Sequence, residues 1–127
     1  MIAKRPTGVA AFGAPEYPWA VTDDKVRAAV KRIVAASAPH AVILFGSYVR
    51  NQTKPASDLD ILVVADDSLE HCRKESVRLR RILRGISMPI DILVVRRGDF
   101  EKFRETPGLI YREVAKEGKV AYERGKA

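Results

Sequence analysis

The chain has 127 residues, which is enough for one domain with a hydrophobic core and too few for two. Apolar residues make up 46% of it and charged residues 31%, a balance that excludes wholesale disorder, and no apolar run approaches the roughly 20 residues that span a bilayer. The formal net charge of +7 favours anionic partners such as nucleotides, nucleic acid or an acidic protein.

The N-terminal residues differ in pattern from the rest of the chain. Residues 1–20 show no steady period and hold three prolines, so we expect an extended N-terminal arm there, followed by a single domain over residues 21–127. Prolines and glycines also interrupt the continuous apolar core that a signal peptide would need. We therefore expect a cytoplasmic protein.

The domain begins with a predicted helix and strand. Thr22 and Asp23 offer an N-cap for the helix. Apolar residues then recur at helical spacing, at Val26, Ala29, Val30 and Ile33. Pro39 ends the helix, and the wholly apolar run 41–45 is typical of a strand that is covered on both faces.

A short helix, a loop and a second strand follow. Ser47 can cap a helix over residues 48–51, and residues 52–57 form a loop. Residues 58–65 then predict a second, largely buried strand.

A long amphipathic helix is expected to start at residues 66–68. Its apolar stripe has steps of three and four, at Leu69, Cys72, Ser76, Leu79, Leu83 and Ile86. Its other face is strongly basic, with Arg73, Lys74, Arg78, Arg80, Arg81 and Arg84. Such a face could contact RNA, an acidic partner or only solvent, and charge runs on helices are most often solvated faces.

The C-terminal third completes the predicted fold. A third strand covers residues 90–95, and Asp99 can cap a helix that stops before Pro107. A last helix over 108–117 precedes a small edge strand over 119–122. This order predicts the fold class α/β (α+β), with a small mixed β-sheet flanked by helices.

Two aspartates stand at the start of the second strand. Asp58 and Asp60 are two residues apart, so on a strand they project from one face while Leu59 points into the core. Adjacent carboxylates repel each other and lose hydration, a cost that a hard divalent cation such as Mg²⁺ offsets best. One cysteine and two histidines do not make a credible Cys/His zinc site, which leaves oxygen ligands.

A third aspartate, Asp91, opens the next strand. The segment "PIDILVV" around it is similar to "DLDILVV" around Asp60. If the two strands are neighbours in register, Asp91 reaches the same site. Three aspartates can hold two metal ions about 4 Å apart, the arrangement used for in-line phosphoryl displacement.

The turn after the first strand suits a phosphate. A strand-to-helix turn directs backbone N–H groups outward, and Gly46, which lacks a Cβ, lets a phosphate approach the backbone. The Ser47 hydroxyl can add a hydrogen bond, and Arg50 could pair with phosphate oxygens. Taken alone, each feature has an ordinary explanation as a turn or a solvated side chain, but the joint pattern is rare at average composition.

This joint pattern, Gly-Ser, ten residues and then Asp-x-Asp, resembles the signature of the polymerase-beta-like nucleotidyltransferase superfamily. Length and layout are similar to its minimal members, the MNT proteins, and the likeness runs from Val21 to Glu123, including "IYREVAKEGKVAYE". It implies a nucleotidyltransferase fold, ATP as co-substrate and Mg²⁺, with two ions. Matched residue by residue, it implies nucleotide contacts by Gly46, Ser47 and Arg50, and catalytic metal ligands in Asp58, Asp60 and Asp91. Asn51 departs from the glycine of many relatives, which puts only the loop conformation in doubt.

The resemblance also implies a partner. Many such proteins are encoded beside a HEPN-domain ribonuclease, so it implies an antitoxin that transfers AMP from ATP to a tyrosine of that toxin. Two alternatives stay open. One is a non-catalytic antitoxin or interaction subunit. The other is a transferase for small hydroxylated molecules such as aminoglycosides, whose relatives usually carry an extra domain for which this chain has no room. No membrane partner is expected, nucleic-acid binding is not excluded, and a homo- or hetero-oligomer is compatible with the pattern.

Overall fold

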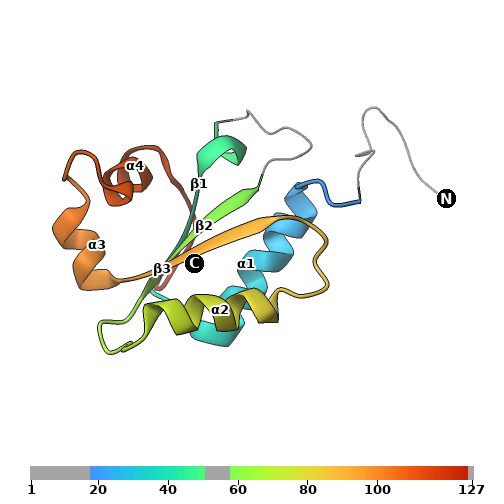
Figure 1. Cartoon of the computed structure of the whole chain (residues 1–127), viewed down its shortest axis with the longest axis horizontal. Coiled ribbons are helices and arrows are strands. Elements are labelled where there is room, and N and C mark those ends of the chain that lie inside the picture. The colour runs from blue at the N-terminus through green and yellow to red at the C-terminus, as the bar shows by residue number, and fades with distance from the viewer. Residues whose placement is uncertain (1–17, 51–57, 126–127) are drawn as a thin grey trace.

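The computed structural model describes residues 18–50 and 58–125, and four strands within them form one sheet. Their order across the sheet is β3 (Ile90–Arg96), β2 (Leu59–Ala65), β1 (Ala41–Phe45) and β4 (Lys119–Glu123) (Figure 1). β1 is antiparallel to both β2 and β4, whereas β2 and β3 are parallel. The prediction of a small mixed sheet flanked by helices is confirmed.

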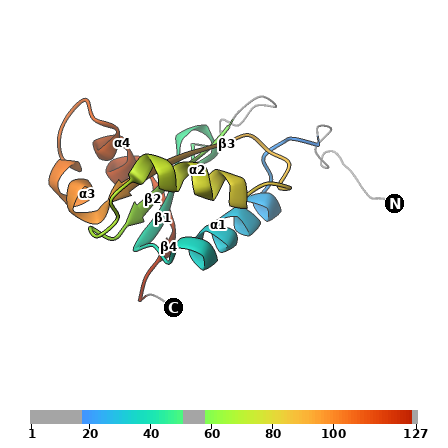
Figure 2. The same cartoon turned by 60° about the horizontal axis from the view of Figure 1, so that its bottom comes forward.

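One face of the sheet is covered by α1 (Asp23–Ser37) and α2 (Cys72–Ile82), which lie side by side in both views (Figures 1 and 2). The Thr22 hydroxyl caps α1 by accepting the Lys25 N–H at 3.3 Å, as the sequence predicted. α2 is the crossover between β2 and β3, because a hairpin cannot join parallel neighbours.

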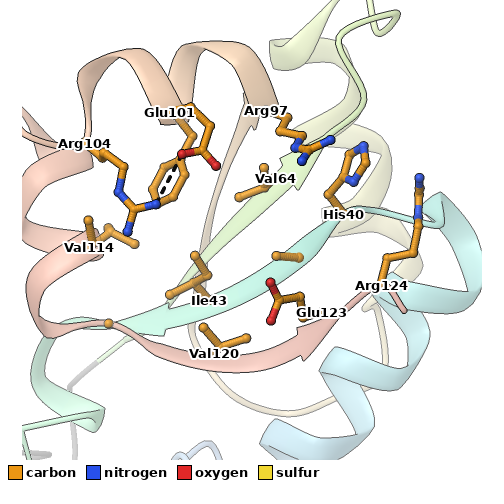
Figure 3. A pocket seen from close by; sticks show the side chains of 14 residues that line it. His40, Ile43, Val64, Arg97, Glu101, Arg104, Val114, Val120, Glu123 and Arg124 are labelled. Carbon is orange, nitrogen blue, oxygen red and sulfur yellow. Dashed lines mark hydrogen bonds and ion pairs between the residues drawn. The ribbon is translucent and has the colours of Figure 1, made fainter. Parts of the chain in front are cut away.

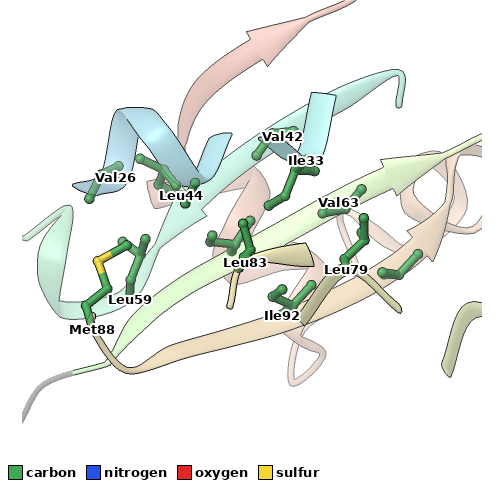
Figure 4. Packing of buried hydrophobic residues seen from close by; sticks show 13 residues of the cluster. Val26, Ile33, Val42, Leu44, Leu59, Val63, Leu79, Leu83, Met88 and Ile92 are labelled. Atoms are coloured by element: carbon green, nitrogen blue, oxygen red, sulfur yellow. The ribbon is translucent and has the colours of Figure 1, made fainter. Parts of the chain in front are cut away.

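The core under these two helices is apolar throughout. Figure 4 shows Val42 and Leu44 of β1 and Val63 of β2 packed against Ile33 of α1 and Leu79 of α2. Ile33 and Leu79 are fully buried, in agreement with the helical stripes read from the sequence. Burial of each such side chain contributes about 1.5–3 kcal/mol relative to exposure.

The opposite face is covered by α3 (Arg97–Phe103) and α4 (Ile110–Glu117). Its core is a smaller cluster of Ile43, Leu62, Val64, Val95, Phe100 and Val114. Coverage on both faces explains why β1 and β2 read as continuous apolar runs rather than alternating ones. Gly118, at the end of α4, packs so closely on this face that a Cβ would lie 2.6 Å from Ile43 Cγ2.

The start of α2 differs from its prediction. The helix begins at Cys72 rather than at 66–68, and residues before it form turns. The Arg96 guanidinium donates to the carbonyl oxygens of Leu69, at 2.6 Å, and Glu70, at 2.8 Å. A helix starting at residue 66 would need these carbonyls for its own N–H groups, so this contact, distant in sequence, delays the helix.

Three other boundaries were also predicted wrongly. Ser47 lies inside a 3₁₀ turn, Gly46–Tyr48, and does not cap it. Asp99 lies in the first turn of α3, which begins at Arg97. α4 begins at Ile110 rather than at Gly108, because Gly108 has a φ of 85°, which is not a helical conformation.

Several expectations concern residues outside the described part. Residues 1–17 of the predicted arm, the predicted loop 52–57 and Asn51 belong to this group. Among the helices of residues 18–50 and 58–125, none combines the length and apolar character needed to cross a membrane.

Candidate active site

Asp60 and Asp91 are register partners on adjacent parallel strands. Partners in register project from the same face of a sheet, and neighbouring strands lie about 4.8 Å apart. Asp60 also pairs with Phe45 across the antiparallel β1–β2 ladder. The condition on which the sequence placed Asp91 beside Asp60, two neighbouring strands in register, is thus met. Both carboxylates project from the face that carries α3 and α4, at the Phe45 end of the sheet.

Asp58 lies just before β2 and is exposed, two residues from Asp60. Burial raises the pKa of Asp60, and repulsion from Asp91, then Asp58, then Glu113 raises that pKa further. The positive charge of Arg50 acts in the opposite direction. Acidic groups from β3, from α4 and from the segment before β2 therefore surround a half-buried carboxylate.

Gly46 has a role at this site that its sequence position did not reveal. Its φ is 80°, and a Cβ on it would lie 2.1 Å from the Asp60 carboxylate oxygen Oδ2. The Asp60 carboxylate therefore rests against the Gly46 backbone. The glycine at position 46 therefore leaves room for the Asp60 carboxylate as well as for an approaching phosphate.

Arg50 and Ser47 lie beside this glycine. Ser47 is half-buried in the 3₁₀ turn, and Arg50 is exposed. Arg50 Nη1 lies 3.6 Å from Glu117 Oε1 of α4, so this cation already has an acidic neighbour besides Asp60.

The turn is anchored to α1. The Tyr48 hydroxyl donates a hydrogen bond to the Asp23 carboxylate in the first turn of that helix. Burial, followed by this hydrogen bond and the charge of Asp23, raises the pKa of Tyr48 to about 12. Tyr48 is therefore a neutral donor that ties the Gly46–Ser47 segment to the helical layer.

Two charged residues near the site were not assigned to it from the sequence. Glu113 of α4 acts on Asp60, and Arg80 of α2 lies 3.7 Å from Asp91. The spacing of Glu113 and Glu117, one helical turn apart, indicates a shared helix face. It does not indicate which strand that face meets.

The carboxylates suit a hard divalent cation, although the described residues do not form a complete coordination site. Among residues 18–50 and 58–125, no three His, Cys, Asp or Glu side chains already stand in position to hold an ion. The Asp91 side chain is 69% exposed and lies near Arg80, so it has freedom to turn toward Asp60. Carboxylate oxygens are the ligands that Mg²⁺ prefers, and a cation would relieve the repulsion between them. Asp60 and Asp91 are therefore chemically suited to bind this ion.

A cavity of about 290 Å³ lies on the same face but at the other end of the sheet. His40 and Val64 line it on the strand side, and Arg97, which starts α3, and Arg104, which follows α3, reach it from the other side (Figure 3). Arg104 Nη1 lies 3.2 Å from Glu101 Oε1, which partly neutralises this wall. The cavity holds none of the three predicted aspartates.

Solved structures with the same fold include three nucleotide-related proteins. A nucleotidyltransferase structure from Sulfolobus solfataricus, described as putative in its own name, superposes with a TM-score of 0.58 and 21% identity, covering 82% of each chain. A toxin–antitoxin structure with AMP-PNP superposes with a TM-score of 0.56 and 19% identity, and the match covers 83% of this chain and 76% of that one. A spectinomycin adenyltransferase from Enterococcus faecialis, solved with ATP and spectinomycin, superposes with a TM-score of 0.53 and 17% identity. The match covers 81% of this chain and 55% of that one. At these identities the likeness shows the fold alone.

Sequence comparison gives the family. No curated protein matches the chain. The model of the family described as "Polymerase beta, Nucleotidyltransferase" matches residues 29–127, which include the Gly46–Ser47 turn and all three aspartates. The chain therefore belongs to the polymerase beta nucleotidyltransferase family.

Proposed function

We propose that this protein is a Mg²⁺-dependent transferase that moves AMP from ATP to a hydroxyl of a partner protein. The preferred acceptor is a tyrosine of a HEPN-type toxin, which makes the protein an antitoxin. One observation carries the proposal: Asp60 and Asp91 are register partners on one face, with the Asp60 carboxylate against the Gly46 turn. Likeness to a toxin–antitoxin structure holding AMP-PNP supports the choice of nucleotide and partner.

The proposed residues divide into two groups. Asp58, Asp60 and Asp91 would hold the metal, which supplies positive charge against the phosphate oxygens. Gly46 and Ser47, in the turn against which the Asp60 carboxylate rests, receive the phosphates of the nucleotide.

Arg50 and Asp91 have opposite tasks in this scheme. Arg50, exposed beside Asp60, exchanges its contact with Glu117 for a phosphate oxygen. Asp91 is the exposed aspartate of the register pair, and in this proposal it takes the proton of the acceptor hydroxyl. The acceptor oxygen then bonds to the α-phosphorus, and the bond to pyrophosphate breaks. A tyrosine has an intrinsic pKa near 10, so a base beside it is chemically useful.

The test is transfer of label from α-labelled ATP, with Mg²⁺, to the protein encoded next to this one. We expect labelled partner with the wild type and a loss of at least about a hundredfold in rate for Asp91→Asn, because a general base contributes about 10²–10⁴-fold. Asp24→Asn is the matched control, since its carboxylate pairs only with Arg27 among the described residues and is 91% exposed. Equal labelling by wild type and Asp91→Asn, or none by either, contradicts the proposal.

A second candidate is transfer to a hydroxylated small molecule. The likeness to a spectinomycin adenyltransferase favours it, although this chain spans 55% of that protein. Metal-dependent pyrophosphate release with an aminocyclitol and without a protein acceptor would support this candidate. If instead Asp58→Asn/Asp60→Asn still neutralises the toxin in cells, the protein acts by binding alone.

A further inference from the structure

The outer edge of β3 is unpaired within the described part of the chain. β3 ends the strand order, and β2 is its partner on the inner side. A groove of about 510 Å³ runs along this edge, between β3 and α2. Its lining includes Arg73, Val77 and Arg80 of α2 and Ile92, Leu93 and Val94 of β3.

The backbone direction on this edge follows from one hydrogen bond. The Leu59 N–H donates to the Pro89 carbonyl at 2.9 Å, at the start of the parallel β2–β3 ladder. In such a ladder alternate residues bond to the same neighbour. Asp91 and Leu93 therefore direct their backbone groups toward β2, whereas Ile92 and Val94 direct theirs outward into the groove.

The groove also offers apolar contacts on both of its sides. Leu93 is 38% exposed on the sheet side, and Val77 is 41% exposed on α2. Both side chains are open to a partner that pairs with the edge of β3. An extended peptide that pairs with such an edge places alternate side chains on either side of it, where these two residues lie.

Charge decides the chemistry of the occupant. Arg73 is exposed, and no carboxylate in residues 18–50 and 58–125 pairs with it. Arg80 lies 3.7 Å from Asp91, so the groove leads directly to the candidate active site. The basic rim favours an acidic segment. It disfavours a second copy of this chain, which would bring Arg73 and Arg80 against their own like charges.

We propose that this groove binds an extended acidic segment of the acceptor protein, added as a strand on β3, so that a hydroxyl of the segment lies beside Asp91. The proposal rests on the proposed function for the role of Asp91. A polypeptide fits better than RNA because the edge presents N–H and C=O groups that pair with a peptide backbone.

The experiment uses the full chain and a synthetic peptide that alternates glutamate and valine around one tyrosine. Amide hydrogen exchange is followed by NMR with and without the peptide. We expect exchange to slow at Ile92 and Val94 and to stay unchanged at Asp91 and Leu93, whose N–H groups already bond to β2. Arg73→Glu should weaken peptide binding at least about tenfold. Arg81→Glu, the same charge reversal on α2 outside the groove, should change it less than about twofold.

Other outcomes overturn the docking proposal. These are unchanged exchange at Ile92 and Val94, equal effects of the two charge reversals, protection of these amides by self-association without peptide, or protection by a short RNA but not by the peptide. Docking and catalysis separate cleanly. If the peptide protects these amides in both the wild type and Asp91→Asn but neither protein transfers AMP, the docking site is retained and the proposed transfer is rejected. If AMP is transferred but the peptide does not protect these amides, the transfer is retained and the docking site is rejected.

Discussion

Gly46 and Asp60 show how a single missing Cβ shapes this site. The Asp60 carboxylate occupies the place that a Cβ at position 46 would take, and the φ of 80° is itself a conformation that L side chains rarely adopt. The two costs are separable, because Gly85 has a φ of 97° and no atom lies within 4 Å of the place where its Cβ would stand. A comparison of these two glycines isolates the contact with Asp60.

We predict that Gly46→Ala destabilises the fold more than Gly85→Ala. Both variants carry the left-handed backbone cost of about 1–2 kcal/mol, and only the first displaces a carboxylate. The additional loss at position 46 should be about 1–3 kcal/mol, typical of overpacking. Urea denaturation measures both values. In Gly46→Ala/Asp60→Ala part of the loss should return, and equal losses in the two single variants would contradict the contact.

The basic face of α2 contacts the neighbouring helix α1 as well as solvent. Arg78 donates to Glu75 through Nε at 2.8 Å and Nη2 at 2.7 Å, and to the Ala36 carbonyl of α1 at 3.0 Å. Arg32 of α1 donates in return to the carbonyls of Ile82, at 3.2 Å, and Arg84, at 3.0 Å. These guanidinium groups join the C-terminal ends of two adjacent helices, where free carbonyls need donors.

Glu75→Gln should therefore reduce stability in a pH-dependent way. The hydrogen bond from Arg78 is the main cause that lowers the pKa of Glu75 below its usual value of 4.5. A lowered pKa in the fold stabilises it above the unfolded pKa, and this contribution is lost as the pH falls through the folded value. We expect the wild type to exceed the variant by about 0.5 kcal/mol at neutral pH. The difference should vanish in acid.

Urea denaturation at neutral pH and below the folded pKa of Glu75 measures this difference. Glu105→Gln is the control, because Glu105 is exposed and the described residues show no ion pair for it. A difference that grows in acid, or one that Glu105→Gln reproduces, would contradict the role of the Arg78 contact.

At the scale of the molecule, the fold concentrates negative charge at one end of a covered sheet. Asp60 comes from β2, Asp91 from β3 and Glu113 from α4, and they meet because the sheet order places β2 beside β3 and α4 packs over that face. The metal-free fold therefore carries a repulsion that a partner cation would relieve. Sites of function commonly trade stability in this manner.

We predict that Asp60→Asn melts at or above the wild-type temperature in chelator at neutral pH. The substitution keeps the shape of the side chain and removes the charge that burial, Asp91 and Asp58 disfavour. AMP transfer should be lost in the same variant. Differential scanning calorimetry gives the melting temperatures, with Asp24→Asn as the exposed control. A clear drop in melting temperature for Asp60→Asn would identify Asp60 as a structural cap instead.

Local pattern was sufficient for much of this protein. The Thr22 cap and apolar spacing define α1, and the apolar runs identify three strands, since each depends on residues close in sequence. Helix starts were less predictable where distant groups intervene, as Arg96 does before α2.

The long-range relations, in contrast, follow from the tertiary fold and not from any local pattern. These are the register of Asp60 with Asp91, the contact of Gly46 with Asp60, the approach of Glu113 and Arg80, and the open edge of β3. Each depends on which strands pair and which helix covers which face, and those choices minimise the free energy of the whole chain rather than of any one segment.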